Sequence, residues 1–238
     1  MITANSDFIS EIDIITQVGM IEPLIENLAA ISGVFQKDIE IIGSFARKNF
    51  DKTNKPCIDL MIPVDNQQTA QRVLKYFGDI PGPSKKKGYM IELLIGWGWI
   101  GIIPAICTNS KNYFYFVNYE ENYYFKTNPV MHVNYLRNVG SWEVVKILKS
   151  ELQNEEIDIN LFILEVLVVE ALKDFNKVHE NMKYKKVLEY LASKFHQIDL
   201  LDPANHENEI SRGLRVNIRE QLRIFAIKAL KNFEGGGP

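Results

Sequence analysis

The stretch D-I-E-I-I-G-S-F-A-R-K-N-F-D-K-T-N-K-P-C-I-D-L-M-I-P-V, from Asp38 to Val64, decides the fold. It reads as a strand, a turn, a short helix, a loop and a second strand. The β-branched residues at 39–42 favour a buried strand, and Gly43-Ser44 breaks it. The apolar run at 60–62 predicts the second strand, with Asp59 at its start.

This stretch also holds the first candidate site. Ser44 stands where the short helix begins, so its hydroxyl lies beside free backbone N–H groups that suit a phosphate. A plain strand-to-helix turn at Gly43-Ser44 is the alternative. Asp59, one strand away, suits a magnesium ion that assists nucleotide chemistry. The alternative for Asp59 is a carboxylate that caps a helix or forms a local salt bridge.

Composition narrows the class of protein. The chain has 238 residues, 46% of them hydrophobic and 24% charged, which is ordinary for a soluble globular protein. A net charge of −3 gives no global attraction to nucleic acid. Cys57 and Cys107 make no disulfide framework, and no basic start precedes an apolar run. We therefore expect a cytoplasmic location, without a signal peptide or a membrane anchor.

The periodicity along the chain divides it into two lobes. We predict an α/β (α+β) lobe at 1–131 and a helical lobe at 132–238, with the ligand cleft between them. In the first lobe, the predicted helices are 7–18, 20–32 and 66–77, and the predicted strands are 89–95, 97–106, 113–119 and 123–125. Residues 78–88 form a loop in this interpretation. In the second lobe, the predicted helices are 141–153, 161–175, 183–195 and 210–233.

Seven short motifs then follow one another in a characteristic order. They are Gly43-Ser44-Phe45-Ala46-Arg47 with Cys57-Ile58-Asp59-Leu60, Gly101-Ile102-Ile103-Pro104-Ala105, the aromatic hairpin Tyr113 to Phe125, Thr127-Asn128-Pro129, Leu148-Lys149, the apolar run Leu161 to Val169 with Glu165, and Asp202-Pro203 with Asn208. This order resembles the nucleotidyltransferases of the DNA polymerase β superfamily. The closest branch is the oligoadenylate-synthase and cyclic-dinucleotide-synthase group, with the archaeal CCA-adding enzymes as cousins.

The resemblance implies a nucleotidyltransferase fold, a mixed sheet flanked by helices and followed by a helical lobe. It implies Asp59 as catalytic residue and Mg²⁺ ligand, and it implies Gly43, Ser44 and Lys149 as nucleotide contacts. Lys149 on a solvated helix face is the alternative. Two of the family's three metal-binding carboxylates are replaced, by Cys57 and Gly101. A thiol is a poor magnesium ligand, so two-metal phosphoryl transfer is not expected.

Three hypotheses about function follow from the resemblance and from the positions at which the sequence differs from the family's pattern. The first is a pseudoenzyme that binds a nucleoside triphosphate or RNA in the cleft and acts as a regulatory or scaffolding partner of another protein, without DNA or membrane binding. The second is an active enzyme making short or cyclic oligonucleotides, or modifying RNA, with Asp59 and an unorthodox acid such as Glu92. We expect Glu92 to face solvent, which counts against this hypothesis. The third is a protein-interaction module with a closed cleft.

Other side chains offer weaker signals. A stripe of arginines in the last predicted helix suits phosphate groups or a solvated face with acidic partners: Arg212, Arg215, Arg219 and Arg223. The lysines at 85–87 add to a basic patch or simply aid solubility. The tyrosine-rich hairpin suits base stacking, or packing against the sheet. The four histidines show no metal-ligand spacing.

Overall fold

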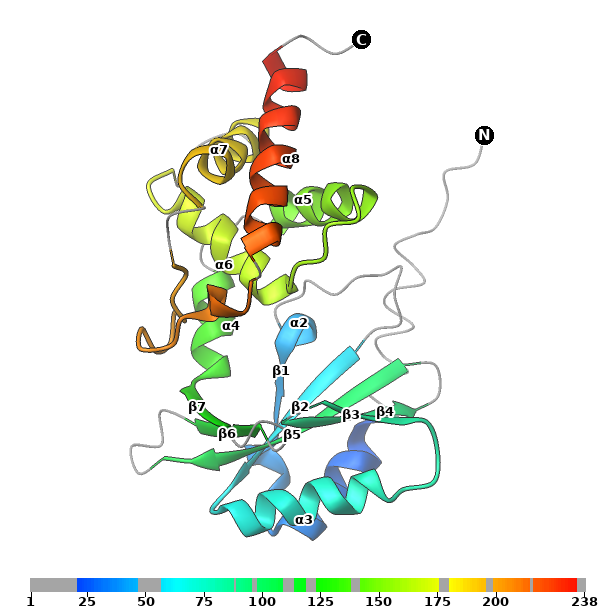
Figure 1. Ribbon diagram of the computed structural model, residues 1–238. Helices are drawn as coiled ribbons and strands as arrows, with labels where there is room; N and C mark the ends of the chain where they lie inside the picture. Colours follow the sequence, from blue (N-terminus) through cyan, green and yellow to red (C-terminus); the bar gives the residue numbers. More distant parts are fainter. Residues whose placement is uncertain are drawn as a thin grey trace. The chain divides into compact units, whose positions relative to one another are not determined.

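The computed structural model describes residues 21–46, 57–87, 89–95, 98–108, 114–118, 123–137, 142–175, 180–195, 199–214 and 216–234. The helix predicted at 7–18 and the hairpin turn at 120–122 lie outside these ranges. The chain forms two compact units, Met1–Pro129 and Val130–Pro238, and each is described by itself (Figure 1).

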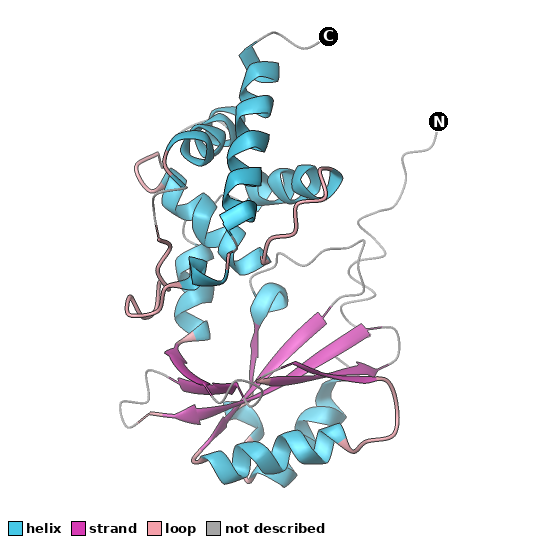
Figure 2. Ribbon diagram, in the orientation of Figure 1, coloured by secondary structure: helices cyan, strands magenta, loops and turns pink. Residues whose placement is uncertain are grey.

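The first unit is built on a mixed β-sheet, drawn in magenta in Figure 2. Its strands are β1 (Glu40–Ile42), β2 (Cys57–Val64), β3 (Ser84–Lys87), β4 (Met90–Ile95), β5 (Gly98–Cys107), β6 (Phe114–Asn118) and β7 (Tyr123–Thr127). The strand order is β1-β2-β5-β4-β3, and β6 pairs with both β5 and β7. The central pair β2 and β5 is parallel, whereas the other neighbours are antiparallel.

One face of this sheet is covered by helices. Helix α3 (Gln67–Gly78) begins at Asn66, whose side chain accepts a hydrogen bond from the Thr69 backbone N–H at 2.9 Å. Its buried side chains join the residues of a helix at 21–32 and the alternate residues of β2 in one core cluster, which includes Leu28, Ile58, Leu60, Ile62, Val73 and Phe77. Figure 1 shows α3 lying against this face. The remaining alternate residues of β2, among them Asp59, therefore point to the opposite face.

The opposite face carries a smaller apolar cluster towards β6 and β7. Its members come from six strands and the residue before β4: Ile42, Met61, Ile103, Ala105, Phe114 and Phe116, with Tyr89, Met90, Cys107 and Phe125 against them. Phe116 and Phe125 stack at 5.2 Å between ring centroids, and Tyr89 meets both rings edge-on. The hairpin aromatics at 116 and 125 are thus packing residues of the sheet.

The second unit is helical. It contains α4 (Pro129–Arg137), α5 (Trp142–Asn154), α6 (Leu161–Leu172), α7 (Glu180–Ser193), a 3-10 turn (Ile210–Gly213) and α8 (Val216–Glu234). Helix α6 begins at Asn160, whose side-chain oxygen accepts from the backbone N–H of Phe162 at 2.9 Å. All but one of the residues at 164–172 are buried, including Glu165, so α6 is the central helix that its apolar sequence predicts.

The predicted fold class is confirmed: a mixed sheet with helices on it, and a helical part after it. Two details of the prediction are wrong. Lys85–Lys87 belong to the edge strand β3 rather than to a loop, and lysines on an edge discourage pairing with other chains. The helix predicted at 210–233 is interrupted after the 3-10 turn, because Leu214 takes an extended conformation with ψ of 115°. In the described residues, no helix is long and apolar enough to cross a membrane.

The sheet core predicts a strong effect of truncating the central strand. Leu60 is fully buried on β2, and its register partner Ile41 on the edge strand β1 is 39% exposed. We expect Leu60→Ala to lower the free energy of unfolding by about 2–5 kcal/mol, because it leaves a cavity against α3. Ile41→Ala is the matched control and should cost about 1 kcal/mol or less. Urea denaturation measures both; equal losses would contradict this core.

Candidate nucleotide site

The candidate site is a row of residues that crosses the sheet from strand to strand. Asp59 on β2 pairs with Ile42 on one side and with Gly101 on the other. Gly101 also pairs with Glu92 on β4, and Glu92 pairs with Lys85 on β3. Because directly opposite residues point to the same face of a sheet, the side chains of this row share the face that α3 does not cover.

The Asp59 carboxylate lies in a gap between two glycines. A Cβ atom added to Gly43 would lie 2.1 Å from Asp59 Oδ2, and one added to Gly101 would lie 2.4 Å from Oδ1. Both separations are far below van der Waals contact, so neither position accepts any other residue without displacing the carboxylate. Gly43 has in addition a φ of 71°, the left-handed region that glycine tolerates. These two glycines therefore define where the carboxylate sits.

The expectation that Glu92 faces solvent is wrong. Its side chain is only 8% exposed and shares the face of Asp59, whereas the sequence predicted a solvent-facing residue. The signal was present in the chain. Ile95 pairs with Gly98, so two residues separate β4 from β5, and counting outward from this short connection places Glu92 opposite Gly101.

Tyr89 belongs to the site, although the sequence analysis did not name it as a candidate. Burial raises the pKa of its phenol, and the carboxylates of Asp59 and Glu92 raise it further. Two carboxylates of the row thus raise the pKa of one hydroxyl group, which stays protonated at neutral pH and can donate a hydrogen bond. No sequence motif marks Tyr89, which lies directly before β4.

The other predicted residues are placed as follows. Gly43 and Ser44 open α2 (Gly43–Ala46), directly after β1. Helix α2 has only four residues, so its end alone does not make a phosphate site, and the phosphate contact stays a prediction. Cys57 stands two residues before Asp59 on β2, opposite Trp99. Lys149 lies on α5 in the second unit, and its contact with a nucleotide likewise stays a prediction.

The donor set at the row does not match two magnesium ions. Two-metal sites need carboxylates that bridge both ions, and Gly101 supplies none. Across the residues that the structure describes, no group of three or more His, Cys, Asp or Glu side chains is placed to hold a metal. Asp59 as a magnesium ligand stays a prediction, and Glu92 brings a second carboxylate to the same face of the sheet across Gly101.

The arrangement of strands and helices matches solved nucleotidyltransferases. No family model and no curated protein matches the sequence. The structure of CdnC from E. coli MS115-1 in complex with HORMA-deltaN superposes with a TM-score of 0.67 at 15% identity, over 82% of this chain and 75% of that one. This chain has a nucleotidyltransferase fold.

Two cyclic dinucleotide synthases show the same similarity to this nucleotidyltransferase fold. CdnE from Elizabethkingia meningoseptica, solved with GTP and Apcpp, gives a TM-score of 0.60 at 14% identity, over 89% of this chain and 91% of that one. The c-UMP-AMP synthase CdnE from Rhodothermus marinus, solved with Apcpp and Upnpp, gives 0.61 at 8% identity, over 91% and 92%. At these identities the similarity shows the fold, and function has to be argued from the residues.

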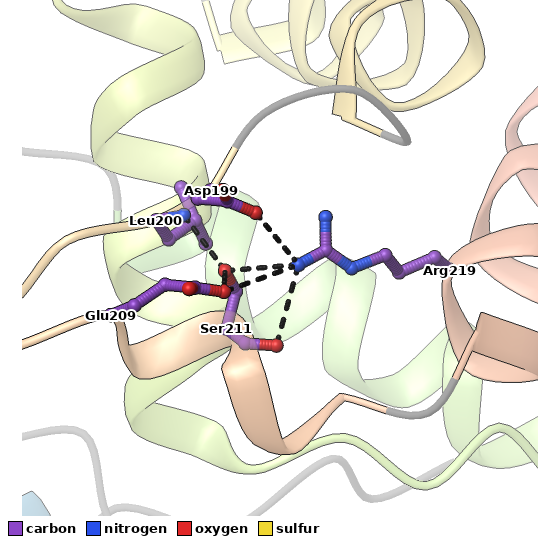
Figure 3. Close-up of polar contacts among 5 residues, drawn as sticks. All are labelled: Asp199, Leu200, Glu209, Ser211 and Arg219. Atoms are coloured by element: carbon purple, nitrogen blue, oxygen red, sulfur yellow. Dashed lines mark hydrogen bonds and ion pairs between the residues drawn. The ribbon is translucent and has the colours of Figure 1, made fainter.

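Some arginines of the predicted stripe form polar contacts within the chain. Figure 3 shows those of Arg219. Arg219 Nη2 donates to Ser211 Oγ at 3.1 Å and to the Ser211 carbonyl at 3.4 Å, and it lies 3.4 Å from Asp199 Oδ1. Arg223 pairs with Glu220 at 2.6 Å on the same helix. These two cations are compensated within the chain, which weakens the stripe as a phosphate-binding surface.

The Asp202-Pro203 motif of the resemblance has a structural role in the helical unit. Asp202 Oδ1 lies 2.6 Å from His132 Nε2 and accepts from the Ala204 backbone N–H at 2.8 Å. Its other oxygen accepts from Asn208 Nδ2 at 3.1 Å. His132 and Asp202 are both buried, so they tie α4 to the loop before the 3-10 turn.

The two-glycine gap predicts a specific coupling between Gly101 and Asp59. We expect Gly101→Ala to lower the free energy of unfolding by about 1–3 kcal/mol, because its methyl group collides with the Asp59 carboxylate. In an Asp59→Ala background this cost should shrink, because the colliding oxygen is gone and only the flexible end of Met90, 2.6 Å from the added Cβ, still has to move. A double-mutant cycle by chemical denaturation measures the coupling. Equal costs in both backgrounds would show that Gly101 does not house the carboxylate.

Proposed function

We propose that this chain is a degenerate nucleotidyltransferase that binds a nucleoside triphosphate beside Gly43, Ser44 and Asp59 without transferring it. In this proposal it serves as a regulatory or scaffolding partner of another protein in the cytoplasm. The observation that carries the proposal is the gap between Gly43 and Gly101 that the Asp59 carboxylate fills. A third acid on β5 has no room while Asp59 keeps this position.

The chemistry explains why this gap matters. Phosphoryl transfer of this kind depends on positioning and on stabilising charge at the transferring phosphoryl group, and metal ions bound by carboxylates do much of both. The row offers Asp59 and, one strand beyond Gly101, Glu92. Neighbouring strands lie about 4.8 Å apart, so Glu92 starts from a backbone that is displaced by that spacing. A catalytic group displaced this far loses the geometry that transfer requires.

Retained nucleotide binding is supported by the fold and by the similar structures. The turn after β1 has Gly43 at its start, and Lys149 lies within α5. Two of the similar structures were solved with nucleoside triphosphates or their analogues. The E. coli structure is a complex of CdnC with HORMA-deltaN, which supports the proposal that this chain binds another protein. The RNA ligand has less support, because Arg219 and Arg223 are compensated internally.

The proposal predicts binding without turnover. Purified full-length protein should form no labelled oligonucleotide from the four radiolabelled triphosphates with Mg²⁺ or Mn²⁺. ATP or GTP should nevertheless raise the melting temperature, since a ligand at about 100 times its Kd adds about 2.7 kcal/mol of stability. Lys149→Ala should reduce this shift, whereas Lys146→Ala, an exposed lysine paired with Glu143 on the same helix, should not.

Two results would contradict the proposal in different ways. Product formation by the purified chain that Asp59→Ala abolishes would show an active enzyme. No shift in melting temperature with millimolar nucleotide, together with no product, would favour the pure protein-interaction module.

A second candidate function is an active nucleotidyltransferase that uses Asp59 and Glu92. The buried position of Glu92 on the face of Asp59 favours it. Glu92 pairs with Gly101, the residue that meets Asp59, and the carboxylates of Glu92 and Asp59 both raise the pKa of the Tyr89 phenol. Such an enzyme would make short or cyclic oligonucleotides, or modify RNA.

The two candidates differ in the role of Glu92. If the chain is active, Glu92→Gln should lower the rate of product formation by about 100-fold or more while folding is retained. Glu143→Gln, an exposed glutamate on α5, is the control and should keep full activity. Activity that survives Glu92→Gln but not Asp59→Ala would exclude Glu92 as the second acid.

A further inference from the structure

The helical unit contains a pocket that the proposed function does not use. It has a volume of about 400 Å³ and lies among α5, α7 and α8. Small-molecule sites in proteins commonly have volumes of about 300–1,000 Å³, so this pocket has room for a compact ligand. All its lining residues belong to the second unit, and none is a residue of the candidate nucleotide site.

The inner part of the pocket is aromatic. Tyr184 on α7 and Phe225 on α8 are almost fully buried, and both line it. Phe233, near the end of α8, is 45% exposed, and its ring centroid lies 6.4 Å from that of Tyr184. A half-exposed phenylalanine beside a buried tyrosine offers a surface on which a flat ring can stack.

The charged side chains around these rings are two carboxylates and one ammonium group. Lys228 Nζ lies 2.6 Å from Glu155 Oε1, so this cation and this anion compensate each other. Glu151 accepts a hydrogen bond from the Tyr184 hydroxyl, and within the part of the chain that the structure describes its carboxylate has no cationic partner. Burial, followed by this hydrogen bond, raises the pKa of Tyr184 far above its ordinary value, so the phenol remains a neutral donor. The Glu151 carboxylate lines the pocket and has further lone pairs for a ligand.

We propose that this pocket binds a flat heteroaromatic ring with adjacent N–H donors and no phosphate, as in a guanine-type nucleobase or nucleoside. The N–H groups on the edge of such a ring match the two oxygens of a carboxylate, here Glu151. Phe233, the exposed ring of the two, supplies the stacking surface. Phosphate-bearing ligands are disfavoured, because the lining carries two carboxylates, Glu151 and Glu155, against one ammonium group, Lys228.

Guanosine is the probe for this proposal, with inosine as the analogue that lacks the exocyclic amine. Isothermal titration calorimetry and saturation-transfer NMR on the full chain measure binding without reference to any activity. Guanosine should bind at least fivefold more tightly than inosine, since the carboxylate loses one donor partner. Guanosine monophosphate should bind more weakly than guanosine.

Variants locate the binding at this pocket. Glu151→Gln keeps an acceptor for the Tyr184 hydroxyl but loses the charge, and it should weaken guanosine about tenfold. Phe233→Ala changes a half-exposed side chain and should weaken guanosine at least fivefold. Glu143→Gln makes the same chemical change on the exposed start of α5, outside the pocket, and should leave the affinity unchanged.

Three results would overturn the proposal: no saturation transfer to guanosine at the limit of its solubility, equal affinity for guanosine and inosine, or affinity that neither Glu151→Gln nor Phe233→Ala alters. The last result would mean that guanosine binds elsewhere in the chain. None of these outcomes bears on triphosphate binding beside Asp59, so the two proposals stand or fall separately.

Discussion

The close approach of the Asp59 carboxylate to two glycine backbones is the constraint on which the candidate site depends. Any Cβ atom at Gly43 or Gly101 would lie within 2.4 Å of a carboxylate oxygen. The three residues come from the end of β1, from β2 and from β5, so the carboxylate position records how these strands are aligned. A sheet with another register would place a side chain where the carboxylate now lies.

This constraint gives the glycine at position 101 a structural role. Gly101 does not merely lack a carboxylate, because its missing side chain is the space that Asp59 occupies. Restoring an acid at this position would require Asp59 to move. The buried Glu92 brings a carboxylate to the same face from the neighbouring strand, but from a different backbone position. Asp59 and Glu92 thus approach this face from different backbone positions, which is why nucleotide binding and transfer have to be assessed separately.

The sequence predicted the order of strands and helices and the special role of the stretch from Asp38 to Val64, because apolar periodicity and glycine breaks are local signals. It misplaced Lys85–Lys87, because three lysines read as a loop when the pairing with β4 is unknown. The face of Glu92 follows only when residues are counted outward from the short connection between β4 and β5, and the position of Tyr89 is a tertiary property. Gly101 was recognised as a missing acid, but its contact with Asp59 is a tertiary property.

The most direct test of this account is a crystal structure of the full chain with GTP and Mn²⁺, in which anomalous scattering counts and locates the metal ions. The account predicts triphosphate density beside Ser44 and Asp59 with at most one manganese ion, and an Asp59 carboxylate still seated between Gly43 and Gly101. Two manganese ions about 3.5–4 Å apart, held by Asp59 and Glu92, would contradict it and would identify the chain as a two-metal nucleotidyltransferase.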